Sequence, residues 1–171
     1  MKKIAVMLMN KDIQIFLRLN RIKISFLDLL MKIITELGGL YLTSFYCVFI
    51  YLFISKQTGL LAGGISLTTS IIIQLIKRII NRPRPYYTFD NIKCLSEPLE
   101  NYSFPSGHTA ATFNLAIIFS RTFPLLAPLF FIIALLVAFS RVYLGVHYPS
   151  DVISGALIAI LITNFILKIL L

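Results

Sequence analysis

The chain is poor in acidic residues, histidine and cysteine. Its 171 residues include seven acids, two histidines and two cysteines, and charged residues make up only 13% of the sequence. Hydrophobic residues make up 58% and the mean hydropathy is +0.87, so the chain cannot cover a soluble domain with a polar surface. This composition excludes an ordinary soluble protein and predicts one domain, residues 1–171, that folds in lipid.

The scarce cysteines and acids also exclude several kinds of site. Cys47 falls in an apolar segment and Cys94 in a polar one, with no C-x-x-C pair and no His/Cys spacing typical of a metal site. Without a cluster of acids to hold magnesium or zinc, we expect no metal and no other cofactor. The net charge of +9 instead predicts contact with anionic headgroups or an anionic substrate. Nucleic acid is not expected, because the bases lie between apolar spans.

Apolar segments separated by shorter polar segments predict an all-α membrane bundle. About five transmembrane helices are expected in the core, residues 37–171, at residues 38–54, 59–76, 106–120, 125–140 and 149–171. Each must be helical, because an open segment in lipid has no other way to satisfy its backbone. Lys56 and Gln57 are expected to form the turn between the first two. Five spans place residues 77–105 and 140–149 on the same side of the membrane.

Residues 1–36 carry too much charge to span the membrane. The N-terminus MKKIAVMLMNKD begins like a signal peptide, but its apolar stretch is only six residues long, Ile4 to Met9, and no small-residue cleavage site follows. We interpret it as mature sequence. Within residues 10–36, apolar side chains recur near helical spacing between the bases. We expect one or two amphipathic helices in the headgroup plane, with a cytosolic extension as the alternative.

The segment SRVYLGVHYPSD, residues 140–151, concentrates polar residues at the end of an apolar run. Pro149 suits the first turn of a helix, because it has no N–H to satisfy. Asp151 follows His147 by four residues, so its carboxylate can accept one imidazole N–H and leave the other nitrogen with its lone pair. His147 is therefore a candidate nucleophile or base. An interfacial histidine beside a helix cap is the alternative.

Two further polar segments are expected on the same face. In PSGH, residues 105–108, Ser106 can cap a helix whose N-terminus binds an anion, with His108 in its first turn. Gly107 allows close backbone approach to a ligand. The segment KRIINRPRP, residues 77–85, adds a cluster of bases on a backbone stiffened by two prolines. Alone, each segment also fits a plain capped helix or a headgroup signal. Together they predict phosphoryl transfer through histidine.

These segments resemble the tripartite signature of the type-2 phosphatidic acid phosphatase family. In that pattern six residues separate a Lys from Arg-Pro, and Pro-Ser-Gly-His follows. The last part is Ser-Arg, five further residues, His, three further residues and Asp. The matching positions here are Lys77 with Arg84-Pro85, Pro105-Ser106-Gly107-His108, and Ser140-Arg141 with His147 and Asp151. The match covers residues 77–151 without a departure, and both histidines of the chain fall on it.

The resemblance implies a metal-independent phosphatase with the helical core shared by vanadium haloperoxidases. It assigns His147 as the phosphohistidine nucleophile, Asp151 as the residue that orients it and His108 as the general acid. The implied phosphate-binding residues are Lys77, Arg84, Ser106, Gly107 and Arg141. Arg78 and Arg82 lie outside the named positions and are possible auxiliary bases.

The substrate that the resemblance implies is a lipid phosphate at the bilayer surface. Small bacterial members suggest undecaprenyl diphosphate, with phosphatidic acid or phosphatidylglycerol phosphate as alternatives. The loop at residues 86–104 is expected to carry the selectivity. A non-catalytic lipid-binding protein and a haloperoxidase are the rival hypotheses; the intact histidines oppose the first and the membrane setting opposes the second.

The expected orientation in the cell membrane rests on two conflicting signals. All but three of the sixteen bases, the exceptions being Lys56, Arg121 and Lys168, lie on the motif face or before the first span. The positive-inside rule would place that face in the cytoplasm, whereas the resemblance places it outside. Because catalysis and headgroup binding account for many of these bases, we expect the active site to face outside.

Overall fold

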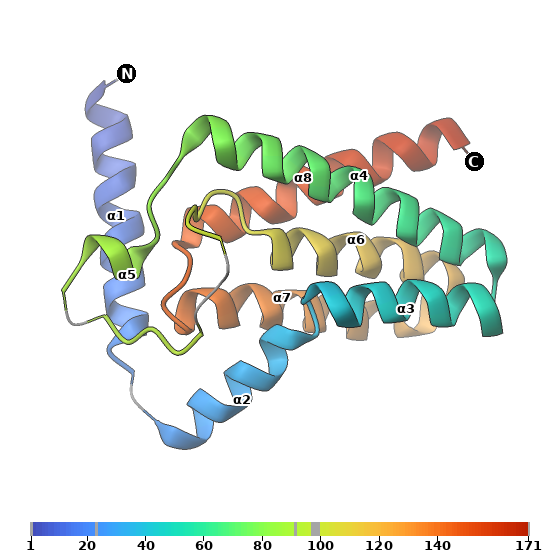
Figure 1. The fold of residues 1–171 in the computed structure, drawn as a ribbon, viewed down its shortest axis with the longest axis horizontal. Coiled ribbons are helices and arrows are strands. Elements are labelled where there is room, and N and C mark those ends of the chain that lie inside the picture. The colour runs from blue at the N-terminus through green and yellow to red at the C-terminus, as the bar shows by residue number, and fades with distance from the viewer. Residues whose placement is uncertain (1, 23, 91, 97–99, 171) are drawn as a thin grey trace.

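Helices run side by side around a central one, α6, in the computed structural model (Figure 1). The structure describes residues 2–22, 24–90, 92–96 and 100–170, which form helices and no strand. The elements are α1 (Lys2–Asn20), α2 (Ser25–Glu36), α3 (Leu40–Phe53), α4 (Lys56–Ile80), α5 (Pro85–Thr88), α6 (Gly107–Thr122), the 3-10 turn η1 (Pro124–Leu126), α7 (Ala127–Tyr143) and α8 (Pro149–Leu170). The predicted all-helical membrane fold is confirmed.

Among the residues that the structure describes, three helices are long and apolar enough to cross a membrane. They are α4, the continuous segment Pro124–Tyr143 that joins η1 and α7, and α8. A fourth span results if α2 and α3, which meet at a bend of 49°, are counted as one broken span. The helix α6, with 16 residues, is shorter than these. The predicted number of five spans therefore stays a prediction.

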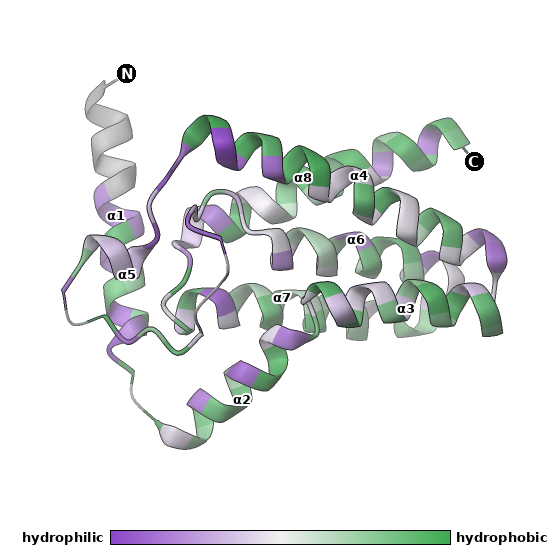
Figure 2. Cartoon of the chain, in the orientation of Figure 1, coloured by the Kyte–Doolittle hydropathy of each residue, from purple (hydrophilic) through white to green (hydrophobic). Residues whose placement is uncertain are grey.

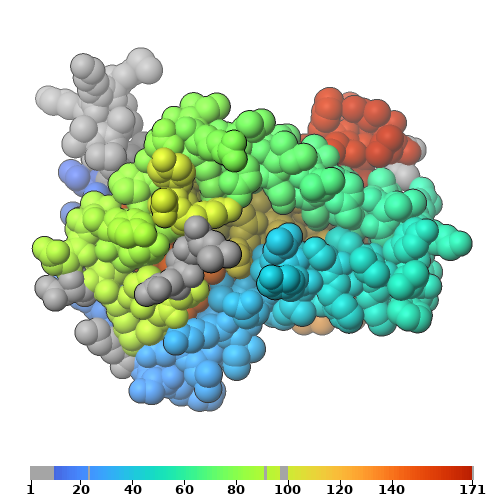
Figure 3. All heavy atoms as spheres, in the orientation of Figure 1, coloured from blue at the N-terminus to red at the C-terminus, as the bar shows by residue number. Residues whose placement is uncertain are grey.

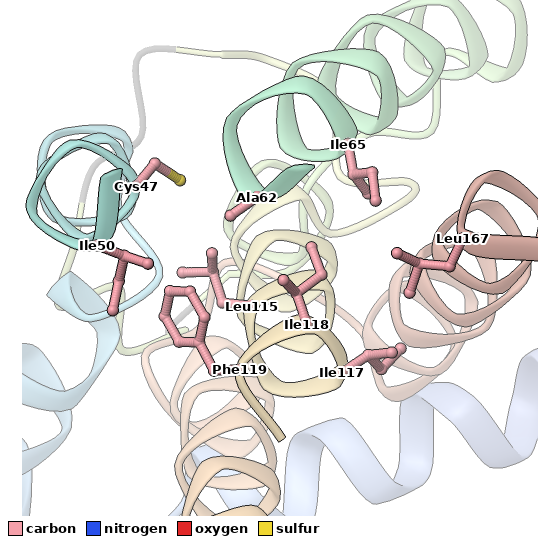
Figure 4. Packing of buried hydrophobic residues seen from close by; sticks show 9 residues of the cluster. All are labelled: Cys47, Ile50, Ala62, Ile65, Leu115, Ile117, Ile118, Phe119 and Leu167. Atoms are coloured by element: carbon pink, nitrogen blue, oxygen red, sulfur yellow. The ribbon is translucent and has the colours of Figure 1, made fainter. Parts of the chain in front are cut away.

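The central helix α6 is buried over most of its length. Its residues Thr109, Ala110 and 112–119 are all buried, so it shows no strong amphipathic pattern, as a helix surrounded by others should not. It packs against α4, α7 and α8. Figure 4 shows one part of this core, where Leu115, Ile118 and Phe119 meet side chains from α3, α4 and α8. Apolar helices thus enclose a helix that begins within the PSGH segment, at Gly107.

Local sequence signals set most helix boundaries. Ser106 precedes α6 and its side chain accepts a hydrogen bond from the Thr109 N–H. Pro149 begins α8, as predicted. The turn expected at Lys56 and Gln57 lies two residues earlier, at Ile54 and Ser55, because the Ser55 hydroxyl accepts from the Thr58 N–H at 3.2 Å and α4 starts at Lys56.

The polar segments gather at one end of the bundle. The hydrophilic residues in Figure 2 are concentrated around α5 and the adjoining loops, whereas α3, α4 and α8 are largely hydrophobic. In Figure 3 the described residues of the segment that follows α4 lie over this end. The first helix, α1, lies across the same end against α7 and α8 (Figure 1). The fold therefore brings the N-terminal helix to the motif face.

Candidate active site

All three sequence motifs meet at the end of the bundle where α4 and α7 end and where α6 and α8 begin. Lys77 lies in the last turn of α4, His108 in the first turn of α6 and Arg141 in the last turn of α7. The loop that leads into α8 carries His147, and Arg84 reaches it from the segment before α5. The predicted residues that are buried are Lys77, Arg84, Ser106, Arg141, His147 and Asp151. The structure therefore brings the predicted site residues together.

The His147 ring lies between a carboxylate and a guanidinium. Its Nδ1 is 3.5 Å from Asp151 Oδ2, and its Nε2 is 3.3 Å from Arg84 Nη1. The Asp151 carboxylate also accepts from the Tyr148 N–H at 2.9 Å, which fixes it beside the ring. A carboxylate next to Nδ1 favours the tautomer with the proton there, so Nε2 keeps its lone pair on the side of the cations.

The charges of three cations act on His147, and one of them, Arg84, lies at Nε2. Arg84 is 1% exposed and is held in place by bonds from Nε to the Glu100 carbonyl at 2.7 Å and from Nη1 to the Val146 carbonyl at 3.0 Å. Arg141 donates from Nη1 to Thr35 Oγ1 at 2.7 Å, and its Nε has no partner among the described residues. Lys77 pairs with the Glu100 carboxylate. Buried, fixed cations of this kind suit a phosphate.

The N-terminus of α6 forms another side of the site. The Ser106 N–H donates to the Asp151 carbonyl at 3.0 Å, which joins the start of α6 to the start of α8. Gly155 lies so close to this junction that a Cβ there would stand 2.5 Å from the Ser106 carbonyl. Gly107 and His108 follow as the first two residues of α6, whose leading N–H groups have no partner within the helix. An anion at this point also adjoins Arg141, Lys77 and Arg84, whose charges act on His108.

The surroundings of His147 hold its imidazole neutral. Burial lowers the pKa of this ring well below its ordinary value of 6.5, and the charges of Arg141, Arg84 and Lys77 lower it further. At neutral pH the ring is unprotonated and can act as a nucleophile.

Several residues that the sequence motifs do not include also contact the site. The Glu100 carboxylate pairs with Lys77, and its carbonyl accepts from Arg84. Thr35 of α2 accepts a hydrogen bond from Arg141. Asp12 of α1 pairs with Arg82, whose Nη1 donates to Asp151 Oδ1 at 2.6 Å. Arg82, a possible auxiliary base from the sequence, thus supports the aspartate. The acid partners could not be found from spacing, because they lie far from the motifs along the chain.

The described part of the chain contains no group of three or more His, Cys, Asp or Glu residues that could hold a metal ion. Positive charge at this site comes instead from Lys77, Arg84 and Arg141, which are side chains of the protein itself. The arrangement can bind a phosphate, present an imidazole to phosphorus and place a second imidazole nearby.

Comparison with known proteins finds a family and several similar proteins. The PAP2 superfamily matches residues 58–171. An undecaprenyl-diphosphatase of Sulfolobus acidocaldarius is 34% identical over 154 residues, which cover 86% of this chain and 72% of that protein. The crystal structure of Aquifex aeolicus LpxE superposes with a TM-score of 0.83 at 29% identity and covers 91% of this chain and 94% of that one. A PAP2-type phosphatidylglycerolphosphate phosphatase from Bacillus subtilis gives 0.77 at 28% identity, with 95% and 87% covered.

Proposed function

This chain belongs to the PAP2 superfamily and is a membrane hydrolase of lipid phosphates, and we propose that it removes the terminal phosphate of undecaprenyl diphosphate through a phosphohistidine. The observation that carries the proposed mechanism is the position of His147, with Asp151 at Nδ1 and Arg84 at Nε2. We treat residues 1–171 as one catalytic domain, because α1 and α2 both contribute side chains to the site.

The first step forms the phosphoenzyme. The terminal phosphate sits among Lys77, Arg84 and Arg141 and at the N-terminus of α6, where Ser106 and Gly107 contact it. The Nε2 lone pair of His147 bonds to phosphorus, and the bond from phosphorus to the bridging oxygen breaks. His108 gives its proton to that oxygen, so lipid monophosphate leaves. The bound phosphate offsets the surrounding positive charge, which favours the protonated form of His108.

The second step releases phosphate. His108, now neutral, takes a proton from a water molecule, and the water oxygen attacks phosphorus. The phosphorus–nitrogen bond breaks, its electron pair returns to His147 Nε2, and inorganic phosphate leaves. Asp151 stabilises the imidazole in its productive orientation throughout. The cations neutralise the charge that develops on the phosphoryl oxygens, so the proposed cycle needs no metal ion.

The choice of substrate is supported by the relative from Sulfolobus acidocaldarius, which is similar along most of this chain. Phosphatidylglycerol phosphate is a second candidate, because the fold is also close to that of the Bacillus subtilis phosphatase. The membrane helices deliver a lipid phosphate to this end of the bundle in either case. We also propose that this end faces the outside of the cell.

A phosphate-release panel tests the substrate. Purified protein in detergent with EDTA should release phosphate from undecaprenyl diphosphate faster than from phosphatidic acid or phosphatidylglycerol phosphate. EDTA should cause no loss, because protein cations bind the phosphate. His147→Ala should abolish release, since it removes the nucleophile. Activity lost on chelation or full turnover by His147→Ala would contradict the mechanism, whereas lipid binding without release from any substrate would favour a non-catalytic protein.

A further inference from the structure

The helix α1 attaches to the active-site end through a narrow face. Its buried residues from position 10 onward are Asp12, Phe16 and Asn20, which recur every four residues, while Lys11 and Gln14 beside them are exposed. Two of the three buried residues are polar. A face that only entered the apolar part of a membrane would not bury an aspartate and an asparagine. This face therefore has polar partners within the protein.

Asp12 is fully engaged with the start of α8 and with Arg82. Its Oδ1 accepts from the Ser150 N–H at 2.8 Å. Its Oδ2 accepts from Ser150 Oγ at 2.5 Å and from Arg82 Nη2 at 2.7 Å. Asp12 is 9% exposed, so these bonds form largely away from water. A buried carboxylate with this set of donors holds its partners in a fixed geometry.

Arg82 connects Asp12 to the aspartate beside His147. While its Nη2 donates to Asp12, its Nη1 donates to Asp151 Oδ1 at 2.6 Å and to Ser150 Oγ at 2.7 Å. The other oxygen, Asp151 Oδ2, is the one that lies 3.5 Å from His147 Nδ1. Arg82 at Oδ1 and the Tyr148 N–H at Oδ2 thus together determine which carboxylate oxygen of Asp151 faces the imidazole.

A second contact from α1 acts on the same arginine. The Arg82 guanidinium lies over the Tyr148 ring, 3.9 Å from its centroid. Phe16 packs edge-on against Tyr148, with 5.5 Å between ring centroids. Asp12 therefore restrains Arg82 directly at Nη2, and Phe16, one helical turn away, supports the Tyr148 ring on which the guanidinium lies.

We propose that Asp12 is a positioning residue for the phosphatase reaction: it holds Arg82 so that the Asp151 carboxylate keeps His147 in its reactive orientation. This inference rests on the proposed function of the site. Without the Asp12 carboxylate, the guanidinium loses the partner of Nη2 and can rotate toward Asp151 or toward solvent. The phosphate-binding cations do not contact Asp12, so its loss changes the orientation of His147 and not the binding of phosphate.

The test compares Asp12→Asn, Asp12→Glu and the exposed control Gln14→Ala from the same helix. Single-turnover experiments with undecaprenyl diphosphate give the rate of phosphoenzyme formation, and the burst amplitude gives the fraction of active protein. We expect Asp12→Asn to slow phosphoenzyme formation about tenfold, which corresponds to about 1.4 kcal/mol. The KM and the burst amplitude should stay near those of the wild type. Asp12→Glu should recover part of the rate, and Gln14→Ala should be unaffected.

A double mutant shows whether Asp12 acts through Arg82. We expect Arg82→Gln to slow the same step, and Asp12→Asn to add little in that background, because the connection is already broken. Additive losses, or a lower burst amplitude at an unchanged rate, would overturn the proposal and leave Asp12 a purely structural residue. If Asp12→Asn does not fold, Asp12→Glu and Arg82→Lys give the same rate measurement. A wild-type protein that releases no phosphate would instead overturn the proposed function itself.

Discussion

At the scale of the residue, the important feature is that the His147 imidazole is uncharged although several cations surround it. Burial, and after it the charges of Arg141 and Arg84, lower the pKa of the ring and so disfavour its protonation, while Asp151 lies at its Nδ1. The same cations that bind an anionic phosphate therefore also preserve the lone pair that attacks it. This double effect requires the arginines to be buried, because exposed charges would be screened by salt and solvent.

The activity should consequently persist to lower pH than an ordinary histidine would allow. As the pH falls through the pKa of His147, the ring gains a proton and loses its nucleophilic lone pair. Because burial and the neighbouring cations lower this pKa, the acidic limb of kcat/KM should lie below pH 6.5, the ordinary value. Arg141→Gln removes one of these charges and should move the limb to higher pH, although it also lowers the rate.

The pH dependence of kcat/KM, measured for the wild type and for Arg141→Gln on one substrate, checks both expectations. Ionisation of the substrate phosphate affects the two proteins alike, so the difference between their profiles reports on His147. A limb above pH 6.5 in the wild type, or a shift to lower pH in Arg141→Gln, would be inconsistent with a neutral, cation-surrounded His147.

The motif residues could be predicted from the sequence because their chemistry and spacing are local. Asp151 follows His147 by four residues at the start of a helix, and Ser106 caps the helix that carries His108. Asp12 gave no such signal. It meets Ser150 across 138 residues of chain, and only the packing of α1 on α8 brings the two together.

At the scale of the element, the contacts of the loop between α5 and α6 could not be predicted from the sequence. In the structure its Ser103 N–H donates to the Arg82 carbonyl at 2.9 Å, and its Glu100 carbonyl holds Arg84. The Glu100 side chain is 43% exposed and pairs with Lys77. Burial alone would raise the pKa of this carboxyl, but the hydrogen bond and charge of Lys77 lower it below its ordinary value. Glu100 is therefore an anion at a cation proposed to bind phosphate.

Removing this anion should improve substrate binding. We expect Glu100→Gln to lower KM about threefold with little change in kcat, because phosphate no longer competes with a carboxylate for Lys77; a partly exposed pair limits the effect to this size. Asp90→Asn removes a charge from an exposed position near the same loop and is the matched control. Steady-state kinetics at two salt concentrations measure the effect, which should shrink as salt rises. A higher KM in Glu100→Gln would instead mean that Glu100 orients Lys77 for the substrate.

At the scale of the whole molecule, the unequal distribution of bases has a structural explanation. Lys77, Arg82, Arg84, Lys93 and Arg141 at the motif end all bond to other groups of the protein. These five bases serve the site and its supporting loops, so they carry little information about topology. Composition and spacing could not separate them from bases that interact with headgroups, because both kinds flank apolar helices.

The orientation proposed here, with the active site outside, can be tested with single cysteines at the two ends of the bundle. In a background with Cys47→Ser and Cys94→Ser, Tyr87→Cys beside the site uses a side chain that is 63% exposed, and Gln57→Cys uses an exposed position at the opposite end. A membrane-impermeant maleimide added to intact cells should label Tyr87→Cys and should reach Gln57→Cys only after permeabilisation. The reverse pattern would place the site in the cytoplasm, as the positive-inside rule alone predicts. Five of the bases at the motif end are already bonded within the protein. An outward-facing site therefore leaves only Arg78 and the N-terminal bases in conflict with that rule, and these can bind headgroups.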